Sequence, residues 1–336
     1  MKILSLFSGI GAFEKALENL KVDYELVNYC EIDKFASYAY EIIHNKPDHF
    51  NLGDITKVNI NLLKDFDLLT HGSPCQSFSL AGNGEGGDEG SGTKSSLMWY
   101  TVDIIRNKMP KYIIWENVKA VICKKHKHNF DKYISTLSDL GYNNYFKVLN
   151  SKDYGAAQSR ERLFVISIRK DADTKGFLFK VRDHRKTTMR DILDVYTDEK
   201  YYIKDNIANE LTKRFEMKLN NRKPSENGIL KLGDINNPKL LDMNKRVFSK
   251  DGTSPTLLTG GDSIPKIVEC RIRRLNPHEC WKLQGFGDEY HKVKEALEEK
   301  FYNGKDNSDS QMYKMAGNSI NVDVLEDLFF ELFIER

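Results

Sequence analysis

A cysteine in a reactive setting is the residue of this sequence best suited to chemistry. Cys75 lies in the octapeptide Gly-Ser-Pro-Cys-Gln-Ser-Phe-Ser, residues 72–79, and a glycine-rich stretch follows it. A structural cysteine usually has apolar neighbours and behaves as a small inert hydrophobe. Here a proline fixes the preceding backbone and small polar residues surround the thiol, as in a loop where a thiolate meets a substrate. Cys75 is therefore a candidate nucleophile, although a Pro-Cys dipeptide alone fits an ordinary turn equally well.

A second set of residues is typical of a nucleotide-like ligand site. The segment 7–11, Phe-Ser-Gly-Ile-Gly, follows an apolar run, so its backbone can approach a ligand closely, but it lacks the third glycine of the dinucleotide fingerprint. An acid in Glu31-Ile-Asp33 suits ribose hydroxyls, and Asp54 beside Ile55 suits the edge and face of an adenine. Each acid alone is also compatible with a solvated loop. Together they favour S-adenosyl-L-methionine over NAD, because no pyrophosphate site is specified.

The hydrophobic pattern predicts the elements that must position these residues. Strands are predicted at 3–7, 24–29, 67–70, 112–115, 145–149 and 163–168, and helices at 12–19, 33–43 and 318–333 with a further helix start at 277–283. Strands that alternate with helices indicate an α/β fold with a mostly parallel, doubly wound sheet. Ligands of such sheets bind beyond the carboxyl ends of the strands, where each motif above lies.

Composition and charge restrict the class of protein. The 336 residues, 40% hydrophobic and 30% charged, suffice for one large core and a smaller second unit. The net charge of +2 requires any nucleic-acid surface to be local. There is no apolar run of about 18 residues and no signal-peptide pattern. The five cysteines are widely spaced, so we expect a cytoplasmic protein without a disulfide framework or a metal site.

Eight blocks then follow one another in an order that points to a family. They are Phe-Ser-Gly-Ile-Gly (7–11), Glu-Ile-Asp (31–33), Gly-Asp-Ile (53–55), Gly-Ser-Pro-Cys-Gln-Ser-Phe-Ser (72–79), Glu-Asn-Val (116–118), Gln-Ser-Arg-Glu-Arg (158–162), Arg-Leu-Asn-Pro-His-Glu-Cys-Trp-Lys-Leu-Gln-Gly-Phe (274–286) and Gln-Met-Tyr-Lys-Met-Ala-Gly-Asn-Ser-Ile (311–320). In this order they resemble the DNA (cytosine-5) methyltransferases of bacterial and phage restriction-modification systems. The resemblance covers nearly the whole chain, with a variable segment between the sixth and seventh blocks.

The resemblance implies a domain plan. Residues 1–185 would form a catalytic domain with the Rossmann-like, doubly wound sheet of S-adenosylmethionine-dependent methyltransferases. Residues 186–270 would form a smaller, partly β target-recognition domain. Residues 271–336 would supply a hinge and a C-terminal helix that completes the catalytic domain.

The resemblance also implies sequence-specific methylation of cytosine carbon 5 in duplex DNA. The target base would leave the stack for a pocket, where the Cys75 thiolate adds to ring carbon 6. Glu116 would hold the Watson–Crick edge of the cytosine, and Arg162 would bind its carbonyl oxygen. Arg160 would brace the site. No side chain is an obvious base for the carbon 5 proton.

Further residues are assigned to ligands. The predicted contacts of S-adenosyl-L-methionine are Phe7, Gly9, Gly11, Glu31, Ile32, Asp54, Ile55, Pro74 and Asn318. The predicted DNA contacts are Gln76, Ser79, Lys94 and the pair Thr256 and Leu257, where a Thr-Leu pair is typical of the end of a target-recognition domain. Relatives more often carry arginine near Lys94, and proline at the position of Gly287.

Three other functions fit parts of the sequence. A transfer-RNA cytosine methyltransferase of the same family would share the catalytic blocks, but the long variable segment favours duplex DNA. A non-catalytic DNA-binding regulator is disfavoured because Cys75, Glu116 and Arg162 are all present, and an NAD-dependent oxidoreductase because the third glycine is missing. The expected form is a monomer that acts on double-stranded DNA, with a cognate restriction endonuclease as a functional partner and no stable complex. The base sequence recognised cannot be inferred from the variable segment, because base contacts depend on loop geometry.

Overall fold

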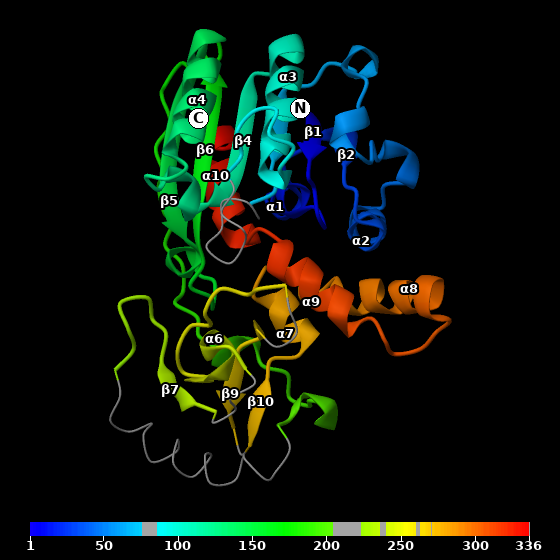
Figure 1. Ribbon diagram of the computed structural model, residues 1–336, viewed down its shortest axis with the longest axis vertical. Helices are drawn as coiled ribbons and strands as arrows, with labels where there is room; N and C mark the ends of the chain where they lie inside the picture. Colours follow the sequence, from blue (N-terminus) through cyan, green and yellow to red (C-terminus); the bar gives the residue numbers. More distant parts are fainter. Residues whose placement is uncertain (76–85, 204–222, 236–239, 260–262, 270, 336) are drawn as a thin grey trace. The chain divides into compact units, whose positions relative to one another are not determined.

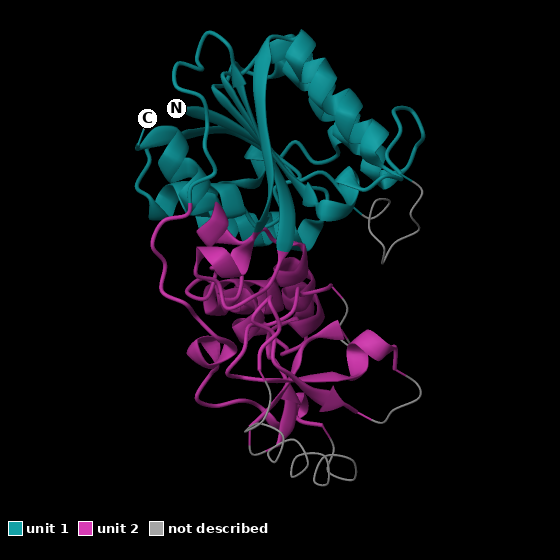
Figure 2. Ribbon diagram, turned by 90° about the vertical axis from the view of Figure 1, so that its left-hand side faces the viewer, with its two compact units in different colours: residues 1–149, 161–180, 325–336 teal, residues 150–160, 181–324 magenta. Residues whose placement is uncertain are grey.

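The chain folds into two compact units. The computed structural model describes residues 1–75, 86–203, 223–235, 240–259, 263–269 and 271–335 (Figure 1). Unit 1 contains residues 1–149, 161–180 and 325–336, and unit 2 contains residues 150–160 and 181–324 (Figure 2). This division differs from the domain limits given above, which stay a prediction.

Unit 1 is built on a six-stranded sheet. Its strands are β1 (Lys2–Leu6), β2 (Glu25–Cys30), β3 (Leu68–His71), β4 (Tyr112–Val118), β5 (Tyr142–Asn150) and β6 (Glu161–Arg169). Their order is β2-β1-β3-β4-β6-β5, with β1 to β4 parallel and β6 antiparallel to β4. The α/β class is confirmed. The reversed direction of β6 is not visible in the sequence, because a run of apolar residues carries no information about strand direction.

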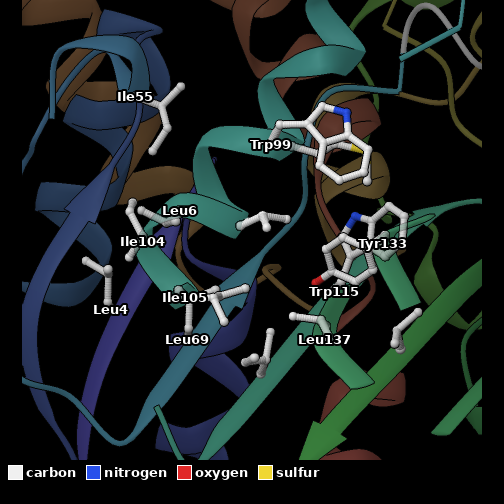
Figure 3. Packing of buried hydrophobic residues seen from close by; sticks show 14 of the residues in the cluster. Leu4, Leu6, Ile55, Leu69, Trp99, Ile104, Ile105, Trp115, Tyr133 and Leu137 are labelled. Atoms are coloured by element: carbon white, nitrogen blue, oxygen red, sulfur yellow. The ribbon is translucent and has the colours of Figure 1, made fainter. Parts of the chain in front are cut away.

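Helices cover both faces of this sheet. They are α1 (Ala12–Asn19), α2 (Lys34–His44), α3 (Met98–Lys108), α4 (Lys127–Asp139) and α10 (Val322–Phe333). Successive side chains of β4 point to opposite faces. Trp115 packs against Tyr133 of α4, with ring centroids 4.4 Å apart, in the core cluster of Figure 3. Tyr112 meets Phe333 of α10, with ring centroids 5.3 Å apart.

Unit 2 has a smaller sheet and its own core. Strands β7 (Lys231–Asp234), β8 (Arg246–Ser249), β9 (Lys266–Val268) and β10 (Ile272–Arg274) are arranged in the order β10-β9-β8-β7. The helices are α6 (Asp242–Lys245), α7 (Pro277–Lys282), α8 (Tyr290–Tyr302) and α9 (Asp309–Asn318). Leu232, Val247 and Ile272 are buried together inside it. The expectation of a smaller, partly β domain is confirmed.

The predicted start of the terminal helix is wrong. The apolar period suggested one helix from residue 318 to 333, but α9 ends at Asn318 and α10 begins at Val322. Ser319 between them is extended, with φ −66° and ψ 156°. The side-chain oxygen of Asn321 then accepts the N–H of Val324 at 3.3 Å, which caps a new helix. The spacing of apolar residues in the sequence does not reveal the break, because both helices bury apolar side chains.

A buried ion pair in unit 2 gives a prediction about stability. Arg273 and Glu279 are both 0% exposed, and two N–H···O contacts of 2.8 Å join them. Glu279→Ala leaves the guanidinium buried, with Glu269, 2.7 Å away, as its one remaining carboxylate partner among the described residues. We expect the free energy of unfolding to fall by about 3 kcal/mol, measured by urea titration. Asp242→Ala, which breaks an exposed pair with Lys245, is the control and should leave the midpoint unchanged.

Candidate active site

The candidate residues of unit 1 lie at one edge of the main sheet. The segment 7–11 follows β1, Glu31 and Ile32 follow β2, and Cys75 follows β3. Glu116 lies near the end of β4. Because β1 to β4 are parallel, all of these residues lie at the carboxyl edge, which is where open α/β sheets bind ligands.

The turn after β1 has an unusual backbone that a carboxylate holds. Phe7 has φ 53°, a left-handed value that is rare outside glycine, and Gly9 has φ 57°. One carboxylate oxygen of Glu31 accepts the N–H of Gly9 at 2.9 Å, and the other accepts the N–H of Asp33 at 2.7 Å. Burial raises the pKa of Glu31, and these backbone donors oppose the shift. Glu31 therefore ties the turn after β1 to the turn after β2.

Three predicted cofactor contacts, Ile32, Asp54 and Ile55, differ in how much of their side chains a ligand could reach. The side chain of Ile32 is 74% exposed, beside the partly buried Glu31, and can cover the face of a flat ring. The Asp54 carboxylate accepts hydrogen bonds from the backbone N–H of Thr56 at 3.0 Å and from the Thr56 hydroxyl at 2.8 Å. These two bonds lower the pKa of Asp54. Ile55 is only 5% exposed and packs in the main core, so its side chain has little surface to offer.

The loop that carries Cys75 is fixed by the end of β4. The indole N–H of Trp115 donates to the Ser73 hydroxyl at 3.0 Å. The Asn117 amide donates to the same hydroxyl and to the Ser73 carbonyl, both at 3.1 Å. Pro74 and Cys75, which follow at once, are partly exposed. Two buried residues of β4 thus hold the loop two residues before the thiol. Gln76 and Ser79 lie outside the described residues.

Glu116 and Arg162 form a shielded ion pair. Arg162 Nε lies 3.1 Å from Glu116 Oε1, and the side chains are 17% and 10% exposed. The antiparallel direction of β6 explains the contact, because it brings the start of β6 to the carboxyl edge of β4, where Val118 pairs with Arg162. The Arg162 guanidinium also donates to the Glu161 carbonyl at 2.7 Å. The pair presents a carboxylate and a fork of donors on one side of the sheet edge.

The remaining predicted residues of unit 2 are Arg160 and residues that it contacts or that neighbour those contacts in the chain. This guanidinium, on a residue 4% exposed, donates to the carbonyls of Leu257, Gly317 and Ser319 at 3.2, 3.0 and 2.8 Å. Thr256 donates its hydroxyl to the Ser159 carbonyl at 2.9 Å. The Leu257 side chain is 1% exposed, so it packs inside the unit, and its DNA contact stays a prediction. Asn318 ends α9 between two of the bonded carbonyls.

Comparison with known proteins decides the family. The sequence profile described as C-5 cytosine-specific DNA methylase matches residues 1–333. The chain belongs to this family. Its enzymes transfer a methyl group to carbon 5 of cytosine in DNA, and they use S-adenosylmethionine in general.

Several relatives match this DNA methylase over most of their length. The orphan methyltransferase M.SPRI of Bacillus phage SPR is 31% identical, covering 99% of this chain and 97% of the relative. The type II methyltransferase M2.ScrFI of Lactococcus lactis subsp. cremoris is 37% identical over 84% of this chain and 71% of the relative. M.HhaI of Haemophilus parahaemolyticus, also type II, is 31% identical over 99% and 94%.

Solved structures agree on the fold of the DNA methylase. The Entamoeba histolytica methyltransferase EhMeth has a TM-score of 0.70 at 19% identity, over 100% of this chain and 98% of its own. A putative DNA modification methyltransferase encoded within a prophage of E. coli has a TM-score of 0.67 at 19% identity, over 99% and 98%. At these identities the likeness supports the architecture alone. The membership of the family excludes the oxidoreductase alternative.

The DNA methylase shows no metal centre in the part that the structure describes, because no three His, Cys, Asp or Glu side chains are grouped there. No helix of the described residues has the length and apolar character needed to cross a membrane. Lys94 is exposed at the start of a short 3-10 helix, Lys94–Leu97.

Ser73, which anchors the cysteine loop, was missed by the sequence reasoning although it lies in the motif of Cys75. A serine between glycine and proline gives no signal of its partners.

Proposed function

We propose that Cys75, Glu116 and Arg162 together methylate carbon 5 of a cytosine extruded from duplex DNA. One observation carries this assignment: a shielded carboxylate–guanidinium pair, 3.1 Å apart, lies at the same sheet edge as the loop of Cys75. A thiol at the same sheet edge as a carboxylate and a fork of donors suits a ring that must accept a nucleophile. The family and its reaction do not depend on this assignment, but the roles of the three residues do.

The first proposed step is addition of the Cys75 thiolate to carbon 6 of the ring. A new S–C bond forms, and the electron pair of the 5,6 double bond moves to make carbon 5 nucleophilic. After methyl transfer, loss of the carbon 5 proton to a base returns a pair to the ring and expels the thiolate. A thiolate suits both directions, because it attacks well and leaves readily. The contacts of Ser73 with Trp115 and Asn117 hold the loop during both steps.

Glu116 and Arg162 would stabilise the charge that enters the ring. The Glu116 carboxyl is proposed to share a proton with ring nitrogen 3, and the Arg162 guanidinium to donate to the ring carbonyl oxygen. Their mutual contact keeps both groups in place before the base arrives. Preorganised groups of this kind need not reorient as charge develops, which is the source of their effect on rate.

S-adenosyl-L-methionine is the proposed methyl donor, which supplies an electrophilic methyl group when bound. The residues of unit 1 fit it: the Glu31 carboxylate suits the ribose hydroxyls, the exposed Ile32 side chain the adenine face, and Asp54 the adenine amino group. The turn at Phe7, Gly9 and Gly11 offers a close backbone approach. Pro74, Ile55 and Asn318 are proposed as further contacts.

The remaining assignments concern DNA and partners. Lys94 is proposed to bind a phosphate, together with Gln76, Ser79 and the Thr256–Leu257 pair. Arg160 is proposed to brace the segments around Leu257 and Ser319, on the strength of its three carbonyl contacts. A cognate restriction endonuclease is proposed as a functional partner. Methylation of every cytosine regardless of flanking bases would refute that partnership.

Bisulfite sequencing tests the substrate directly. In DNA from cells that express the chain, we expect methylation at cytosines within one short sequence context and none in cells without it. Purified protein with labelled methyl donor should then modify a duplex containing that context and leave transfer RNA unlabelled. Labelling of transfer RNA without labelling of duplex DNA would overturn the DNA assignment in favour of the transfer-RNA enzyme.

A further inference from the structure

A histidine with no place in the reaction lies directly behind the proposed cofactor turn. His44 is the last residue of α2, and its side chain is 0% exposed. Its Nε2 lies 3.1 Å from the carbonyl oxygen of Ile10, between the two glycines of the turn. A Cβ added to Gly11 would stand 2.1 Å from the same nitrogen. The ring is therefore in direct contact with the backbone of the turn.

The other ring nitrogen faces a carboxylate. Nδ1 of His44 lies 2.9 Å from Oε1 of Glu18 on α1, and the hydroxyl of Tyr24 donates to the same oxygen at 2.8 Å. The hydrogen bond from His44 lowers the pKa of Glu18 against the opposing effect of burial, which is the larger single influence. Glu18 therefore faces the ring as an anion.

The contacts of His44 with the Ile10 carbonyl and with Glu18 can both be hydrogen bonds in only one protonation state of the ring. A carbonyl oxygen and an ionised carboxylate can only accept hydrogen bonds, so both ring nitrogens must carry a proton for both bonds to exist.

The other titratable groups around the ring do not replace the Glu18 contact. Glu14 on α1 is 0% exposed, and burial raises its pKa, which favours its neutral form. The Tyr40 ring of α2 lies 4.6 Å from the imidazole, and burial raises the pKa of Tyr40 as well. Lys15 acts on Glu18 from the same helix and favours its charged form.

We propose that His44 is a positioning residue for the cofactor turn, which it holds as a doubly protonated imidazolium between the Ile10 carbonyl and Glu18. This inference rests on the proposed cofactor site. When the ring loses one proton, the remaining proton stays on Nδ1, because a bond to a carboxylate is stronger than one to a neutral carbonyl. The lone pair of Nε2 then faces the Ile10 oxygen, and the turn loses its support. Cofactor affinity should therefore fall as the pH rises.

Calorimetric binding of S-adenosyl-L-homocysteine to the full chain between pH 6 and pH 8.5 tests this, because histidine is the side chain whose charge in general changes near neutral pH. We expect the dissociation constant of the wild-type protein to rise by about fivefold, the value of one lost hydrogen bond. Glu18→Gln should flatten the profile, because an amide can donate to Nδ1 and a neutral ring then keeps its bond to Ile10. His44→Gln should also be flat, because its amide donates to Ile10 at every pH.

Glu25→Gln is the matched control, since it makes the same change on an exposed residue of β2 and should keep the wild-type profile. A flat wild-type profile overturns the proposal without any variant, and so does a Glu18→Gln profile as steep as that of the wild type. Binding at no pH would refute the cofactor site and this inference together. A pH-dependent affinity in a protein that fails to methylate duplex DNA would refute only the proposed reaction.

Discussion

Cys75→Ser is expected to lower the rate of methyl transfer about ten-thousandfold or more, while DNA binding is retained. A serine hydroxyl is far less acidic than a thiol and forms almost no anion at neutral pH, so addition to ring carbon 6 stops. The bonds that Ser73 makes with Trp115 and Asn117 are unchanged by the substitution. Methyl transfer is measured with labelled donor and duplex DNA, and binding by gel shift on the same duplex.

Cys123→Ser is the matched control, because it makes the same chemical change at an exposed cysteine that has no proposed role in the reaction. It should keep the wild-type rate. A duplex containing 5-fluorocytosine should trap the wild-type protein as an adduct that survives denaturing electrophoresis, because the fluorine cannot leave as a proton does. Turnover by Cys75→Ser at the wild-type rate would show that another group is the nucleophile.

The motifs of the sequence predict which residues form the candidate site better than they predict how those residues meet. Cys75 and Glu31 could be located because each closely follows a run of apolar residues, and the carboxyl end of a parallel strand is a known place for ligands. The contact of Glu116 with Arg162 depends on β6 running antiparallel to β4. Nothing in the residues 161–169 indicates that direction.

Contacts over long sequence separation were the least predictable part. His44 was not singled out in the sequence, since its partners Ile10 and Glu18 lie 34 and 26 residues away along the chain. The break between α9 and α10 was hidden because the apolar spacing of α10 could be extended back to Asn318, whereas the extended Ser319 and the cap at Asn321 separate the helices. Segment 150–160 joins β5 to β6 yet belongs to unit 2. No change in amino-acid composition along the chain indicates this division.

Glu116→Gln is expected to lower kcat about a thousandfold, with little change in DNA binding. The amide keeps the size of the carboxyl group, but it cannot share a proton with ring nitrogen 3 and it no longer holds Arg162 by charge. The ring then gains negative charge as the thiolate adds, without the proton that Glu116 would share with it. Single-turnover rates on duplex DNA measure the chemical step apart from product release. Glu161→Gln is the control: its carboxylate pairs with Lys119 at the surface, and the rate should stay within about twofold.

A double-mutant cycle with Arg162→Lys tests whether the pair acts as one unit. Lysine keeps the positive charge but lacks the planar fork that can bind Glu116 and a ring carbonyl at once. If the two side chains stabilise a single charge in the ring, either change already removes most of the effect, and the double variant is scarcely slower than the slower single one. If the losses instead multiply, the two side chains act independently, and the 3.1 Å contact between them serves the structure of the sheet edge and not the reaction.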